Sequence, residues 1–372
     1  MKERKSNFEL LRIVAMLFII LGHSASHGIF HFGEADVFAA WQGGSLVNKA
    51  FSSLLLPGGA VGVGIFFMIT GYFQVEKEKY SIKKVLLQVL FYGLVISALY
   101  IVYLLVKGAF TAGMLWAFLK NFFLKTMLNP LSGGSWWYVT AYFLIMLFSP
   151  LLNAFLKKLS PRGFMTFLMT LCIIWYGISY LTGGTYIQAE RGLLFYSIGA
   201  YIKLHGDDVK VSAVKCFSCL VGIWITGGLA YYFYSSIMVS NNGGAGYTIM
   251  ADLLDLYIFM VVTPLAAVSL FLWFKGLNMG RVKVINRIAG TTLGIYLIHD
   301  SEIFRTTLWQ GIFHMDSGLY GSGLYPLYAI GISIIIFLAG MLIDLARQML
   351  IQKPLEKTAD KIEDKIRKRL FQ

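Results

Sequence analysis

The chain has 372 residues, of which 57% are hydrophobic and only 14% are charged, and its mean hydropathy is +0.68. Soluble globular proteins carry more charge and fewer long apolar runs, so this composition excludes that class and indicates a membrane protein. The formal net charge of +13 would also suit a nucleic-acid-binding protein, but the positions of the basic residues argue against one.

Long apolar segments recur along the chain and predict about ten transmembrane helices. They are centred near residues 8–27, 56–75, 84–106, 136–156, 163–181, 192–204, 212–235, 253–274, 288–304 and 325–348, of which the sixth is short and the ninth is interrupted by polar residues. Lipid offers backbone groups no hydrogen-bond partner, so the predicted fold is all-α, a polytopic integral membrane helix bundle. Residues 113–128 are too charged to span and are predicted to form an interfacial or re-entrant helix on the outer side.

The basic residues alternate with these predicted spans. With the N-terminus inside, 25 of the 32 Lys and Arg residues fall on inner segments, six fall on outer segments, and Arg12 lies in the first span. Because cytoplasmic segments carry such an excess, both termini are predicted to be cytoplasmic. We therefore expect one transmembrane domain, 1–350, and a basic amphipathic tail, 351–372, that lies on the inner membrane surface. A solvated helical tail is the alternative.

The first predicted span carries charged side chains at membrane depth. Its uninterrupted apolar run, 13–21, covers about 13 Å, whereas the hydrocarbon core is about 30 Å thick, so the span must also include Arg12 and His23. Their separation of eleven residues places both on one helix face, ~16 Å apart along the axis. Glu9 lies three residues before Arg12 and is predicted to pair with it. Such a face usually turns towards a bundle interior or a wet cavity. An Arg12 that extends to the inner headgroups is the alternative.

Two further clusters near the outer side have more than one interpretation. His23, His27 and His31 repeat every four residues, which would suit a metal site, but His31 follows a glycine and no acidic or cysteine cluster is obvious nearby. We therefore expect no metal. Trp136, Trp137 and Tyr138 fit either an aromatic belt at the membrane interface or stacking platforms for sugar rings.

Four segments resemble motifs of the membrane-bound acyltransferase-3 family. The segment LLRIVAMLFIILGH (10–23) matches its Arg–ten residues–His motif, and GIFFMITGYF (64–73) is similar to its Phe-Phe-x-x-Ser-Gly-Phe segment, with Thr70 where Ser is usual. The segment GSWWYVTAYF (134–143) resembles its aromatic segment at an outer helix start. The segment RIAGTTLGIYLIHD (287–300) resembles its late Ser-Phe-Gly-Ile-Tyr-Leu-Ile-His segment and matches at His299. The order of the motifs and the ten-span topology resemble those of the family over nearly the whole chain.

The resemblance implies a membrane O-acyltransferase. Members of the family move an acyl group, usually acetyl, from cytoplasmic acyl-CoA to a hydroxyl of an extracytoplasmic or membrane-attached carbohydrate. It therefore implies acetyl-CoA as donor, a carbohydrate acceptor and a multi-pass position in a cell membrane, expected to be a bacterial plasma membrane. Carried over to the matching positions of this chain, the resemblance implies that His23 is the catalytic base and Arg12 its motif partner. His299 is a second base, a residue that shapes the cavity or a core histidine, and Asp300 and Glu302 are candidates to orient a histidine.

The predicted substrate-binding residues come from the same motifs, from the loop after the second span and from the position three residues before Arg12. They are Glu9, Phe66, Phe67, Thr70, Gly71, Lys83, Lys84, Trp136, Trp137 and Tyr138. The two lysines stand where the family often has an Arg-x-x-Arg pattern. Lysine binds phosphate as a point charge, without the bidentate fork of arginine, so donor binding is expected to differ there in detail.

Two other function classes stay open on the sequence. Charged groups within spans and glycine-interrupted helices also suit a sugar or polysaccharide transporter or flippase, although no inverted repeat is present in the sequence. A membrane scaffold of a polysaccharide synthesis complex is the third. The acceptor, the acyl chain length and the oligomeric state do not follow from the residues.

Overall fold

The computed structural model describes residues 5–32, 37–77, 82–108, 111, 113, 114, 116, 136–174, 188–206, 211–240 and 247–370. Over these residues the chain forms helices and connecting turns without any strand, which confirms the all-α class. Most of the predicted outer helix over 113–128 lies outside the described residues.

Seven helical segments within the described residues are long and apolar enough to cross a membrane. They are α1 (Ser6–Ser26), α3 (Leu46–Leu55) continuing into α4 (Pro57–Gln74), α5 (Lys83–Val106), α7 (Trp137–Leu156), α11 (Ala213–Ser240), α12 (Tyr247–Tyr257) continuing through η3 (Ile258–Val262) into α13 (Thr263–Lys275), and α17 (Tyr325–Leu350). Each agrees with one of the predicted spans. At 1.5 Å per residue, the 21 residues of α1 extend about 32 Å, which matches the hydrocarbon thickness.

The other three predicted spans are not among these seven, so the count of ten is not confirmed. The fifth begins as α8 (Pro161–Cys172) and runs beyond the described residues, and the sixth is α10 (Gln188–His205). The ninth is divided into α14 (Lys283–Ala289), α15 (Thr292–His299) and α16 (Glu302–Thr306). At the first break the hydroxyl of Thr291 donates to the carbonyl of Ile288 at 2.7 Å, and this local turn takes the place of helix continuation.

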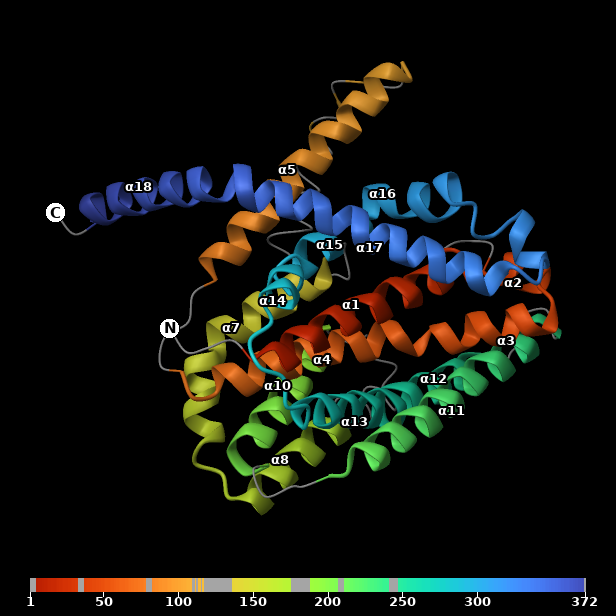
Figure 1. The fold of residues 1–372 in the computed structure, drawn as a ribbon, viewed down its shortest axis with the longest axis horizontal. Helices are drawn as coiled ribbons and strands as arrows, with labels where there is room; N and C mark the ends of the chain where they lie inside the picture. Colours follow the sequence, from red (N-terminus) through yellow and green to blue (C-terminus); the bar gives the residue numbers. More distant parts are fainter. Residues whose placement is uncertain are drawn as a thin grey trace.

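Helix α1 lies within the bundle and contacts α4, α17, α14 and α13 (Figure 1). Its first half joins a hydrophobic core with α4, α10, α13 and α7, to which Phe8, Leu11 and Ala15 contribute. Its second half joins another core with α15 and α17, to which Met16 and Ile19 contribute. The first helix therefore connects two packed halves of the bundle.

Close backbone contact fixes α10 against α4. A Cβ atom at Gly71 of α4 would overlap the carbonyl oxygen of Tyr196, and one at Gly199 of α10 would overlap that of Met68. Glycine is therefore required on both helices at this crossing. This close packing gives the motif residue Gly71 a structural role.

The remaining elements lie at the two ends of the bundle. The short helices α2 (Ala39–Gln42), η4 (Thr307–Ile312) and η5 (Gly318–Gly321) lie at the end where α1 finishes (Figure 1). At the other end, α18 (Gln352–Leu370) continues from α17 and passes the start of α5. There Lys83 pairs with Asp360, and Lys84 Nζ lies 3.7 Å from Glu356 Oε1.

Candidate functional site

Two histidines that are far apart in sequence meet where α1 and α15 end. His23 Nδ1 lies 3.1 Å from His299 Nε2, and His299 Nδ1 lies 2.7 Å from the carbonyl oxygen of Ile295. His299 is buried, whereas the side chain of His23 is 18% exposed. The structure thus brings together the two histidines that the motifs single out.

These contacts determine which ring nitrogens carry protons when both rings are neutral. The carbonyl of Ile295 only accepts, so Nδ1 of His299 must carry the hydrogen and donate it. Nε2 of His299 is then an acceptor, and Nδ1 of His23 must be the donor in the contact between the rings. His23 is therefore left with an unprotonated Nε2. A nitrogen with this lone pair is what a general base requires.

A carboxylate lies beside the two rings. Asp300, which directly follows α15, has its Oδ1 atom 3.7 Å from His23 Nδ1 and 3.9 Å from His27 Nε2. The same oxygen lies 3.4 Å from Nη1 of Arg305. Asp300 is buried, so its charge interacts with the neighbouring rings through little solvent. The sequence had indicated Asp300 as a candidate to orient a histidine, whereas it considered His27 only as a metal ligand and gave no role to Arg305.

The cluster of His23, His27 and Asp300 has the residue types of a metal site. Ligand atoms of His23, His27 and Asp300 all lie within 4.8 Å of one another, so the fold brings a carboxylate to two of the three histidines of the repeat. His31 does not join them, because its Nε2 atom lies 3.8 Å from a different carboxylate, that of Asp316. The guanidinium of Arg305 beside Asp300 opposes binding of a divalent cation. That no metal is needed stays a prediction.

A cavity of about 520 Å³ lies between these histidines and the end of the bundle where α18 begins. Five of the predicted site residues line it, namely Arg12, Phe66, Thr70, Lys84 and Tyr138. At one end its walls also include Arg287 and Arg347, and at the other they include Ile19 and Tyr296. Positive charge is therefore concentrated in the part of the cavity near α18, α14 and the start of α5.

Arg12 lies in the wall of this cavity and pairs with Glu9, as predicted. Its Nη1 atom is 3.3 Å from Glu9 Oε2, and its side chain is 31% exposed. None of the described residues that line the cavity is a histidine. The cavity instead ends one helical turn before His23, at Ile19 and Tyr296. The ring of Tyr296 packs edge-on against His299, with centroids 6.3 Å apart. In this structure Ile19 and Tyr296 therefore separate His23 from the cavity that Arg12 lines.

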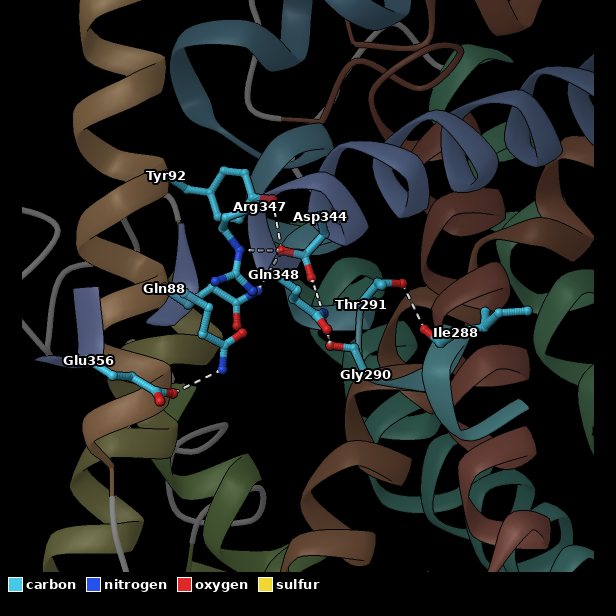
Figure 2. A network of polar contacts seen from close by, with 10 residues as sticks. Gln88, Tyr92, Ile288, Gly290, Thr291, Asp344, Arg347, Gln348 and Glu356 are labelled. Carbon is cyan, nitrogen blue, oxygen red and sulfur yellow. Dashed lines mark hydrogen bonds and ion pairs between the residues drawn. The ribbon is translucent and has the colours of Figure 1, made fainter. Parts of the chain in front are cut away.

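A buried polar network, shown in Figure 2, supports the cavity wall. One carboxylate oxygen of Asp344 on α17 accepts hydrogen bonds from Gln88 Nε2 (3.0 Å), Tyr92 Oη (2.8 Å) and Arg347 Nε (2.7 Å), and the other accepts from Gln348 Nε2 at 2.7 Å. The network joins α5 to α17. Gln348 also donates to the carbonyl of residue 290, next to α15. One signal of this network is present in the sequence, an Asp and an Arg three residues apart within the last predicted span.

Gly294 of α15 allows this network to form. A Cβ atom on Gly294 would overlap the carboxylate of Asp344. Because that carboxylate sits against the backbone of α15, Gly294 is needed for α15 and α17 to approach each other. This contact explains one glycine of the motif at 287–300.

The other predicted residues have packing positions. Phe67 is buried, and its ring centroid lies 4.8 Å from that of Tyr138. Trp136 is buried with a positive φ of 62°, whereas Trp137 is half-buried. Lys83 pairs with the tail helix α18 and does not line the cavity.

Comparison with protein families gives one match. Residues 5–345 match the model of acyltransferase family 3, described as an acyltransferase domain, and this range contains all four motif segments. Neither the curated proteins nor the solved structures contain a match to this chain. Since the match covers most of the chain and seven described helices are apolar enough to span a membrane, this multi-pass protein belongs to acyltransferase family 3, a family of membrane acyltransferases.

Proposed function

We propose that this protein is an O-acyltransferase that moves an acyl group, most simply acetyl, from cytoplasmic acyl-CoA to a hydroxyl of a cell-surface or exported carbohydrate. The observation that carries the proposal is the contact of 3.1 Å between His23 and His299, which leaves Nε2 of His23 unprotonated. His23 lies one helical turn beyond Ile19, where the basic cavity ends. Its setting is a bacterial plasma membrane, with the donor entering from the cytoplasmic side.

The donor occupies the cavity. Arg12, Lys84 and Arg287 line it and supply positive charge for the phosphates of coenzyme A. The pantetheine arm is long and narrow, so it brings the thioester from these cations to the far end of the cavity. There Phe66 and Tyr138 provide an apolar wall for a short acyl group.

Acyl transfer then depends on His23. Its Nε2 atom takes the proton of the acceptor hydroxyl as the hydroxyl oxygen attacks the thioester carbonyl carbon. The imidazolium that forms donates to His299 Nε2 and lies 3.7 Å from Asp300, which stabilises its charge. When the C–S bond breaks, the same proton passes to the departing thiolate. The products are an ester and free coenzyme A.

Reconstituted vesicles test the proposal. Purified protein is inserted into liposomes, radiolabelled acetyl-CoA is supplied on the side of α18, and an oligosaccharide acceptor is supplied on the opposite side. Covalent label on the sugar is expected for the wild type and for His314→Ala, a control at an exposed histidine outside the cluster. His23→Ala is expected to abolish transfer.

Other outcomes would replace the proposal. Correctly inserted His23→Ala protein that transfers acetyl at the wild-type rate would refute it. Unmodified sugar crossing the bilayer, with no label attached, would favour a transporter. Changed recruitment of synthesis enzymes, with the acetyl content of the surface glycan untouched, would favour a scaffold.

A further inference from the structure

The cavity ends at Ile19, one helical turn before His23. The residues of α1 that line it are Arg12, Met16 and Ile19, and their spacing of four and then three residues places them on one face of the helix. His23 follows Ile19 by four residues, so it continues the same face about 6 Å further along the axis. A thioester that moves along this face from the cavity to His23 must therefore pass Ile19.

The side chain of Ile19 is held in place by its neighbours. Ile19 is buried, and it belongs to the same hydrophobic core as Tyr296, which lines the end of the cavity with it. A Cβ atom on Gly62 of α4 would lie 2.6 Å from Cγ1 of Ile19, so this side chain lies directly against the backbone of α4. A β-branched side chain in a helix also has few rotamers open to it. The barrier between the cavity and His23 is therefore apolar and tightly packed.

The two sides of this barrier hold different parts of the proposed reaction. The donor lies in the cavity, whereas His23 is in the last turn of α1, which ends at Ser26. There the side chains of His23 and His27 are both partly exposed, so water reaches them. His23 can take a proton from water in the same way as from a sugar hydroxyl. A thioester that reached His23 before the acceptor would therefore be hydrolysed.

We propose that Ile19 determines the specificity of the enzyme for a sugar hydroxyl over water, by keeping the thioester away from His23 until the acceptor is bound. This inference rests on the proposed acyl transfer. The bound acceptor displaces the Ile19 side chain, and its binding energy offsets the cost of this movement. With the barrier removed, a water oxygen bonds to the carbonyl carbon and one water proton passes to Nε2 of His23. When the C–S bond breaks, that proton goes to the departing thiolate, which gives acetic acid and free coenzyme A.

The matched pair Ile19→Ala and Ile20→Ala tests the inference. Both residues are isoleucines of α1 that are buried in the same core, but Ile20 does not line the cavity. The measurement is the release of free coenzyme A from acetyl-CoA by the purified protein, first without an acceptor and then with the oligosaccharide. Ile19→Ala is expected to raise the rate without acceptor by about two- to tenfold, because the cost of moving this side chain off its rotamer is removed. Ile20→Ala is expected to keep the wild-type rate.

The dependence on His23 and on the acceptor gives a second comparison. The extra hydrolysis is expected to disappear when His23→Ala is combined with Ile19→Ala, because no base is then left to take the water proton. Hydrolysis that persists in the double variant overturns the inference. The transfer rate of Ile19→Ala is expected to rise less than its hydrolysis rate, since the acceptor already opens the barrier in the wild type. An equal rise of both rates overturns the role of Ile19 in specificity.

The remaining outcomes separate this inference from the proposed function. Equal hydrolysis by Ile19→Ala and Ile20→Ala, with His23→Ala inactive in transfer, overturns the role of Ile19 and leaves the proposed function intact. Full transfer by His23→Ala overturns the proposed function itself. If Ile19→Ala has a lower melting temperature than Ile20→Ala, Ile19→Val decides, because it removes one methyl group and keeps the branched side chain. Hydrolysis by Ile19→Val at the wild-type rate then overturns the inference.

Discussion

Replacement of His299 tests how the proton positions on the two histidines are set. His299 does two separate things, since Nδ1 donates to the carbonyl of Ile295 and Nε2 accepts from His23. Glutamine places an amide oxygen near the position of Nε2, whereas the shorter asparagine reaches only the position of Nδ1. His299→Gln can therefore keep the acceptor for His23, and His299→Asn cannot.

The expected magnitude follows from that one hydrogen bond. In the transition state His23 is an imidazolium, and a hydrogen bond from a charged donor contributes about 1.5–3 kcal/mol. Each 1.36 kcal/mol is a factor of ten in rate, so losing this bond lowers kcat by about tenfold to about 150-fold. We expect this loss in His299→Asn and in His299→Ala, and a smaller one in His299→Gln.

The assay is the initial rate of acetyl transfer in reconstituted vesicles, with kcat and KM for acetyl-CoA determined separately. The KM is expected to be similar in all three variants, because none of the described cavity-lining residues is changed. Equal kcat values for His299→Gln and His299→Asn would refute the assignment of Nε2 as the acceptor. Wild-type kcat in His299→Ala would remove His299 from the mechanism.

Three further predictions concern the polar network on α17, the crossing of α4 with α10, and the cavity. Asp344→Ala leaves the buried guanidinium of Arg347 without its carboxylate, which should cost about 3–5 kcal/mol of stability. Thermal unfolding in detergent measures this loss, and an unchanged melting temperature would show that the network is unimportant. Gly71→Ala forces a methyl group into a carbonyl oxygen of α10 and should destabilise by about 1–3 kcal/mol in the same measurement, and no loss would contradict the close crossing. Lys84→Ala should raise the KM for acetyl-CoA with little effect on stability, because its pair with Glu356 is exposed and such pairs contribute at most about 1 kcal/mol. An unchanged KM would exclude Lys84 from donor binding.

Local pattern was enough for the class of protein and for most helices. Seven predicted spans agree with long apolar helices, because a run of about 20 apolar residues leaves the backbone no alternative in lipid. The pairing of Glu9 with Arg12 was also predictable, since residues three apart are neighbours on any helix. The four motifs were enough to indicate the family.

The segment 288–304 shows where that kind of pattern fails. Its average hydropathy predicted one span, but the chain turns after Ala289 and again at Asp300, giving three short helices. Hydropathy measures the environment of a segment and is insensitive to its turns. The second turn matters most, because it places Asp300 beside His23.

The packing of the helices, and no local pattern, brings the polar groups together. His23 and His299 are 276 residues apart, and Gln88 and Asp344 are 256 apart, so no local spacing relates them. Their contacts depend on how α1, α5, α15 and α17 pack, and that packing depends on a glycine such as Gly294 at a crossing. The residues of the first span predicted a charged face that turns towards the bundle interior or a wet cavity. Which partners it would find there was a property of the packed helices, because long-range contacts are set by side-chain shape across the whole bundle.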